Sequence, residues 1–276
     1  MDLQGAINQI RESIGLQTDF TQLLLAYALL MARILPVILL TPFLGGESVP
    51  SEVRLGIGVM LGMVLYPAVI TQATNVPVSP ILFIALMLKE LFIGLSMSFV
   101  VGIVFDAANV AGSLIDTFSG ITQAQLMVPQ LQMNVTLFAN LKIQLVTVIF
   151  VTLGFHHFVI QAFADSLAMV ALDQYPRFSH GFWPFFELIL RVFGDLIRIA
   201  LALASPVLLA TFLTDLALGM INRVAPQVQV FFVAMQIKPA VTGLIMISAL
   251  HLILARVLIE YNVMLRWLRQ ALELLR

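Results

Sequence analysis

The stretch MINRVAPQVQVFFVAMQIKP, from Met220 to Pro239, sets a polar turn between two long apolar runs. It carries Arg223, Gln227 and Lys238. Polar and charged side chains at membrane depth are costly unless protein or water surrounds them. The stretch therefore predicts a helical hairpin in a membrane-type protein, and we expect its polar residues to serve assembly or function.

The composition of the 276-residue chain also indicates a membrane protein. Hydrophobic residues make up 61%, charged residues 11%, and the mean hydropathy is +1.03, which leaves too few polar side chains to cover a soluble globule. The net charge of -1 and the 14 scattered Lys and Arg provide no basic face for nucleic acid. Cysteine is absent, which excludes disulfides, thiol catalysis and cysteine-ligated metals.

The apolar segments predict an all-α, polytopic, membrane-associated protein built from helical hairpins. They cover about residues 20–41, 53–71, 81–105, 134–160, 186–221 and 229–260, without a competing strand pattern. Several contain an internal charge or proline, such as Arg33, Lys89 and Pro206. Such helices are tolerated where protein or a water-filled cavity surrounds them. We therefore expect broken helices that pack into a larger hetero-oligomeric assembly.

The two ends of the chain differ from its apolar middle, residues 20–260. Residues 1–19 predict a short amphipathic segment, with disorder as the open alternative. Residues 261–276 form a basic tail, which the positive-inside rule places in the cytoplasm. The tail aligns Leu265, Leu268, Leu272 and Leu275 on one face, which predicts binding to the membrane or to another component. We expect residues 1–276 to form a single domain, and the side of the N-terminus stays open.

Further runs carry ordered motifs: ARILPVILLTPFLGGESVPSEVR from Ala32, KELFIG from Lys89, GSLIDTFSGITQAQLMVP from Gly112, and LGFHHFVIQAFADSLAMVALDQYP from Leu153. With the stretch from Asp215 to Lys238, these runs resemble the export-gate family of type III secretion. That family comprises the injectisome T subunit and its flagellar counterpart, the R subunit. Asp116 favours the injectisome branch, and Val128 departs from the acidic residue that flagellar relatives usually have before this proline.

The resemblance implies a non-enzymatic core subunit of a type III export apparatus in the bacterial inner membrane, within the secretion-system basal body. The subunit would form part of the channel through which unfolded proteins are exported. The implied partners are the small R- and S-type membrane subunits, the switch-type U subunit, the large V subunit, unfolded protein substrates and membrane lipid. No cofactor and no nucleic acid is implied. A flagellar homologue with the same role is the alternative within the family.

The resemblance also assigns candidate residues. The central loop, which contributes to a pore plug in the family, maps to Gly112–Pro129, with candidates Gly112, Asp116, Phe118, Gly120, Met127 and Pro129. The candidate interface and hinge residues are Arg33, Pro42, Pro50, Arg54, Lys89, Glu90, Asp215, Arg223, Pro226, Gln227, Phe231 and Lys238.

The chemistry of these residues leaves alternatives open. Glycines give the loop flexible points and Met127 is a deformable filler, as a seal requires; without the resemblance, ordinary packing is the simpler explanation of Phe118 and Met127. Asp116 could instead cap a helix that starts near Thr117. Lys89 and Glu90 project ~100° apart on a helix, which predicts separate partners. Asp215 and Arg223 share a helix face, which favours interhelical pairing or subunit contacts.

The main alternative from another functional class is a proton- or ion-coupled secondary transporter. Lys89, Glu90, Asp116, Asp215 and Arg223 would then form a relay near the bilayer midplane. The absence of a clear internal repeat argues against a transporter. No His pair has metal-ligand spacing, and no phosphate-binding loop or nucleophile-elbow motif is present, so we expect neither a metal site nor an enzyme.

Overall fold

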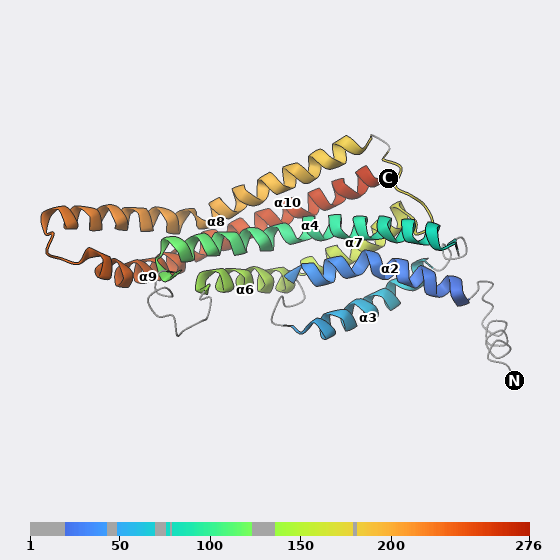
Figure 1. Cartoon of the computed structure of the whole chain (residues 1–276), viewed down its shortest axis with the longest axis horizontal. Helices are drawn as coiled ribbons and strands as arrows, with labels where there is room; N and C mark the ends of the chain where they lie inside the picture. Colours follow the sequence, from blue (N-terminus) through green and yellow to red (C-terminus); the bar gives the residue numbers. More distant parts are fainter. Residues whose placement is uncertain (1–19, 43–48, 70–75, 78, 123–135, 179–180) are drawn as a thin grey trace.

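The computed structural model describes residues 20–42, 49–69, 76–77, 79–122, 136–178 and 181–276. The described part of the chain is helical, which confirms the predicted all-α class. The helices are α2 (Phe20–Leu40), α3 (Ser51–Val69), α4 (Pro80–Phe118), α6 (Leu137–Thr152), α7 (Phe155–Met169), α8 (Phe182–Val224), α9 (Val230–Ser248) and α10 (Leu250–Leu275). Figure 1 shows an elongated bundle along α4, with α8 and α9 extending beyond it at one end. The predicted amphipathic segment 1–19 lies outside the described residues.

The described helices are compatible with a polytopic membrane protein. Those long and apolar enough to cross a membrane are Thr21–Leu40, Pro80–Phe118, Phe182–Val224 and Val230–Ser248. Helices α6 and α7 qualify together as a further span, but the pair is bent by 71°. Gly154 at this bend has a φ of +76°, a backbone conformation that favours glycine. The prediction of broken helices is thereby confirmed.

Some element boundaries differ from the predicted segments. Helix α4 continues beyond residue 105 to Phe118, and the predicted segment 229–260 divides into α9 and α10 near Ala249. The predicted tail is the last part of α10 rather than an element of its own. Its Leu268, Leu272 and Leu275 are buried inside this chain. That apolar face therefore packs on the protein's own body, and the prediction that it binds the membrane or a partner is wrong.

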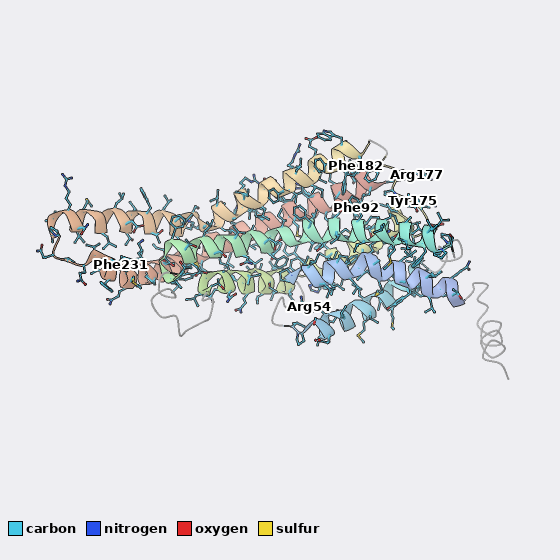
Figure 2. All side chains as sticks on the ribbon, in the orientation of Figure 1. Arg54, Phe92, Tyr175, Arg177, Phe182 and Phe231 are labelled. Carbon is cyan, nitrogen blue, oxygen red and sulfur yellow. The ribbon has the colours of Figure 1, made fainter. Side chains whose placement is uncertain are left out.

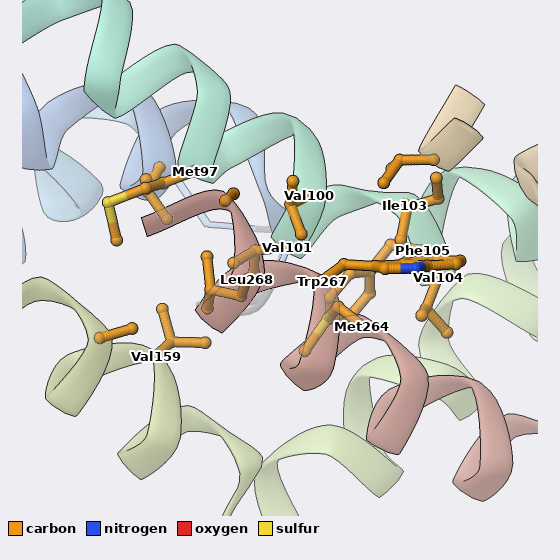
Figure 3. Close-up of a cluster of buried hydrophobic side chains, with 14 of the residues drawn as sticks. Met97, Val100, Val101, Ile103, Val104, Phe105, Val159, Met264, Trp267 and Leu268 are labelled. Carbon is orange, nitrogen blue, oxygen red and sulfur yellow. The ribbon is translucent and has the colours of Figure 1, made fainter. Parts of the chain in front are cut away.

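The core is built around the middle of α4, where Val100–Phe105 are almost all fully buried. Figure 3 shows these side chains facing Val159 of α7 and Met264, Trp267 and Leu268 of α10. Tyr261 of α10 packs its ring 6.0 Å from that of Phe105, measured between centroids. Its hydroxyl donates a 2.7 Å hydrogen bond to the Val146 carbonyl. Burial raises the pKa of Tyr261, so the hydroxyl stays protonated as a donor.

Candidate functional site

Charged side chains of α2 and α4 form a buried group, Arg33, Lys89 and Glu90, which we call the ion cluster. Arg33 and Glu90 are 0% exposed and Lys89 is 7% exposed. The Arg33 Nη2 donates to Glu90 Oε1 at 2.9 Å, and its Nε pairs with Oε2. Lys89 Nζ also pairs with Glu90 Oε1. The expectation of separate partners for Lys89 and Glu90 is therefore wrong, because their flexible side chains converge on one site.

The ion cluster holds the turn that follows α7. Arg33 Nη2 donates to the Val170 carbonyl at 2.9 Å, and Nη1 donates to Ser166 Oγ at 3.3 Å. Lys89 Nζ donates to the carbonyls of Ala171, Leu172 and Gln174 at 3.1, 3.1 and 3.0 Å. These bonds tie α2, α4 and the end of α7 together. The sequence placed Arg33, Lys89 and Glu90 at a subunit interface, whereas their partners lie within this chain.

The close approach of α2 and α4 at the ion cluster depends on Gly94. A Cβ atom at this position would lie 2.4 Å from the Arg33 carbonyl oxygen, which is backbone and cannot rotate away. In the sequence, Gly94 is the last residue of the KELFIG motif. Its position one turn after Glu90 was the available signal for a close helix contact.

Gly112 and Asp116 lie in the last two turns of α4, where α6 packs against it. Asp116 is 1% exposed, and its Oδ1 and Oδ2 accept hydrogen bonds from the backbone N–H groups of Phe138 and Ala139 at 2.9 and 3.1 Å. These N–H groups belong to the first turn of α6, where a helix leaves its donors unsatisfied. Such a cap contributes about 1 kcal/mol. Asp116 thus caps a helix, but α6 rather than one near Thr117.

The other candidates in the plug segment have different surroundings. Phe118 is 50% exposed at the end of α4, and Gly120 follows with a φ of +79°. Met127 and Pro129 lie outside the described residues. The plug segment predicted to begin at Gly112 therefore starts inside a packed helix, and Phe118 offers exposed apolar surface at the end of that helix.

Pro42, Pro50 and Arg54 lie where α2 passes to α3. Pro50 is exposed, and its carbonyl accepts the Val53 N–H at 3.1 Å, which begins α3. Arg54 Nη1 donates to the Leu39 carbonyl at 3.1 Å. This bond joins the first turn of α3 to the last turn of α2, so Arg54 also has an internal partner.

The outer half of α8 and all of α9 form a projecting hairpin, residues 209–248, which we call the α8–α9 hairpin (Figure 1). Asp215 Oδ1 and Lys238 Nζ form an ion pair of 2.5 Å across it, which is the interhelical pairing predicted for Asp215. Arg223 is exposed and forms no ion pair with any described residue. Pro226 and Gln227 occupy the exposed connecting turn. Figure 2 places Phe231 at this far end of the molecule, opposite Phe182.

The outward surface of this hairpin is apolar and has no cover within the described chain. Within an apolar window of 18 residues, only 6% of the residues are buried in α9, against 67% in α4, so α9 depends on lipid or another protein for burial. The large exposed apolar side chains of residues 209–248, together called the outer hairpin face, are Leu209, Phe212, Leu213, Leu216, Met220, Ile221, Val224, Val228, Phe231, Phe232, Ile237, Leu244 and Ile247.

The five residues of the alternative relay do not come together. Glu90 and Asp116 are 26 positions apart on the same helix, which separates their Cα atoms by about 39 Å. Lys89 and Glu90 are held in the ion cluster, and Asp215 pairs with Lys238. Among the described residues, no group of three His, Asp or Glu side chains is arranged to hold a metal. A cavity of about 220 Å³ between α7 and α10 shares no residue with the candidate site.

Most of the chain is similar in sequence to known proteins. The profile of the family described as "Bacterial export proteins, family 1" matches residues 24–262. The flagellar biosynthetic protein FliR of Escherichia coli is 28% identical over 226 residues, which cover 82% of this chain and 84% of that protein. The Yop proteins translocation protein T of Yersinia pestis is 31% identical over 226 residues, 81% and 85% of the two chains. FliR of Bacillus subtilis is 26% identical over 250 residues, 90% and 95% of the two chains.

Proposed function

Because the chain belongs to family 1 of the bacterial export proteins, we propose that it forms part of the channel through which a type III apparatus exports unfolded proteins. The chain is a non-enzymatic, inner-membrane component of such an apparatus. The observation that carries the channel proposal is the outer hairpin face, since a surface this apolar needs neighbouring subunits or lipid. We propose that residues 1–276 act as one unit in this assembly.

The proposed partners are several copies of the small R- and S-type membrane subunits, together with the U and V subunits. Arg223 supports a specific protein contact on the hairpin, because a cation among exposed apolar side chains requires a counter-charge once lipid or protein covers it. A carboxylate from a neighbouring subunit would supply that charge. Pro226, Gln227 and Phe231 lie beside Arg223 and belong to the same proposed interface.

Affinity purification of the tagged full chain in mild detergent, followed by native mass spectrometry, tests this proposal. We expect a hetero-oligomer that contains several copies of two other small apolar subunits. Recovery of a lone monomer or homodimer would contradict the channel proposal and favour the secondary transporter.

The identity of the recovered subunits also decides between the injectisome and flagellar branches. We propose the injectisome branch because of Asp116. Relatives from flagellar and translocation systems match at similar identity, and recovery of flagellar subunits would reject the injectisome branch.

Charges on the outer hairpin face should prevent assembly without unfolding the chain. Phe231→Glu and Leu244→Glu place carboxylates where the side chains are 53% and 64% exposed in the free chain, so folding should proceed while docking fails. We expect at least a tenfold loss of co-purified partners, the equivalent of about 1.4 kcal/mol. Gln270→Glu, at an exposed position of α10, is the matched control and should retain the partners. Full recovery of the partners with both hairpin variants would contradict the proposal that the outer hairpin face binds them.

We further propose that the segment Gly112–Pro129 contributes to closing the channel at rest. The packed position of Gly112 and Asp116 means that a deletion should begin after them. Removing residues 123–129 spares the Asp116 cap and should leave assembly intact while the closed complex conducts ions in planar bilayers. Normal assembly with unchanged conductance would contradict a plug in this segment, and Phe118→Ala tests its described apolar end in the same way.

A further inference from the structure

Helix α8 changes direction about midway along its length (Figure 1). Pro206 lies inside this helix, in its middle third, and a proline inside a helix is the usual cause of such a change in direction. Proline has no N–H, and its ring displaces the carbonyl four residues earlier, here that of Ala202. The Ser205 hydroxyl donates to this freed carbonyl at 2.9 Å. The sequence thus provides both the cause of the bend and a donor for one of the carbonyls it exposes.

The bend separates two parts of α8 with different surroundings. Before it, α8 packs on the body through a row of buried side chains: Phe185, Leu188, Val192, Ile199, Ala200, Leu203 and Ala204. After it, the described burial is limited to Val207, Thr211 and Leu218, and the helix continues into the α8–α9 hairpin. The geometry at Pro206 therefore sets the direction in which the hairpin leaves the body.

Lys142 of α6 reaches this bend from the other side. Its side chain is 2% exposed, and its Nζ donates to the Leu203 carbonyl at 2.7 Å. No acidic side chain pairs with it among the described residues. A buried ammonium without a counter-ion is expensive, so its carbonyl contact at the bend must offset part of that cost.

The position of Lys142 makes it a direct link across the bundle. Helices α6 and α8 both pack on α4, and the Lys142 bond joins α6 to α8 themselves. A carbonyl that tilts away from the helix axis presents its second lone pair more openly to an outside donor, so the bond to Lys142 favours the bent form of α8. We propose that Lys142 is a positioning residue that fixes the bend at Pro206, and with it the direction of the α8–α9 hairpin.

The absence of cysteine allows a direct test of this geometry in the full chain. Leu190→Cys and Met220→Cys place spin labels on the two parts of α8, at side chains that are 52% and 65% exposed. These positions are 30 residues apart, so a straight helix would separate them by about 45 Å. Pulsed electron paramagnetic resonance should give a narrow distribution at a shorter distance. Lys142→Met, which removes the donors and keeps an unbranched apolar side chain, should broaden the distribution and move it toward 45 Å.

Two controls make the result specific. Lys238→Met makes the same change inside the hairpin and should leave the distance unchanged, whereas Pro206→Ala should lengthen it. An unaltered distribution in Lys142→Met would overturn the role of Lys142, whatever Pro206→Ala does. Should Lys142→Met fail to fold, Lys142→Gln, whose shorter side chain cannot reach Leu203, provides the same test. The consequence for partner docking rests on the proposed function, but the distance is measured on the chain without partners, so either proposal can fail alone.

Discussion

Glu90→Gln should lower the free energy of unfolding by about 3–5 kcal/mol, the range for removing one partner from a buried ion pair. The substitution keeps the side-chain shape but leaves the cations of Arg33 and Lys89 buried without their shared carboxylate. Because both cations also hold the turn after α7, that turn should loosen together with the α2–α4 contact. Thermal unfolding of the full chain in mild detergent, followed by circular dichroism, measures the change.

Glu187→Gln is the matched control, because it removes a carboxylate from an ion pair on the surface. Arg191 and Glu187 form a 3.1 Å pair one helical turn apart, with side chains 64% and 57% exposed. Solvent screening limits the contribution of such a pair to about 0.5 kcal/mol. Equal unfolding temperatures for the two variants would mean that the ion cluster gains nothing from being buried and paired.

The ion cluster also marks how far the sequence could predict the site. Charges inside apolar segments correctly indicated groups that need protein around them. The sequence did not identify their partners, since Arg33 and Glu90 are 57 residues apart and meet only through the packing of α2 on α4. Partners at a subunit interface and partners within the same chain would both offset the cost of burying these charges. Only the three-dimensional arrangement of the helices distinguishes them.

The predicted segment 134–160 ran across the break between α6 and α7, although the sequence carries a local signal for it. Gly154 follows Leu153 at the bend between α6 and α7, and its positive φ explains that break. The predicted apolar segment 81–105 stopped short of the end of α4, which continues through Asp106 and Asn109. Three alanines, Ala107, Ala108 and Ala111, continue the helix there and are buried. The division of α9 from α10 near Ala249 carries neither Gly nor Pro, so neither of these local signals indicated it.

For Asp116, too, the sequence did not identify the partner, because that partner is distant along the chain. A cap was predicted from the sequence only as the alternative role of Asp116, and for the nearest helix start, because most caps act within the same turn. The donors that Asp116 satisfies lie 22 and 23 residues further on, at the beginning of α6. This cap works only because α6 begins against the last turns of α4, at the place where Gly112 has no side chain.

Gly112→Ala should therefore destabilise the chain by about 1–3 kcal/mol, the usual cost of overpacking. The added Cβ atom would lie 2.3 Å from the Ala139 Cα, 2.6 Å from its N and 2.8 Å from the Phe138 carbonyl oxygen. These are backbone atoms, so α6 as a whole would have to move away from its Asp116 cap. Thermal unfolding of the full chain in detergent measures this loss.

Gly219→Ala is the control for Gly112→Ala, because we expect it to change the stability in the opposite direction. Gly219 lies inside α8 with nothing within 4 Å of a Cβ atom, so alanine there should stabilise the chain by about 0.5–1 kcal/mol through helix propensity alone. Both glycines are helical, and they differ in whether another backbone occupies the space of the side chain. A flexible point at the start of a plug would accept alanine much as Gly219 does. An increase in unfolding temperature for both variants would restore Gly112 to the predicted loop and contradict its role as the contact between α4 and α6.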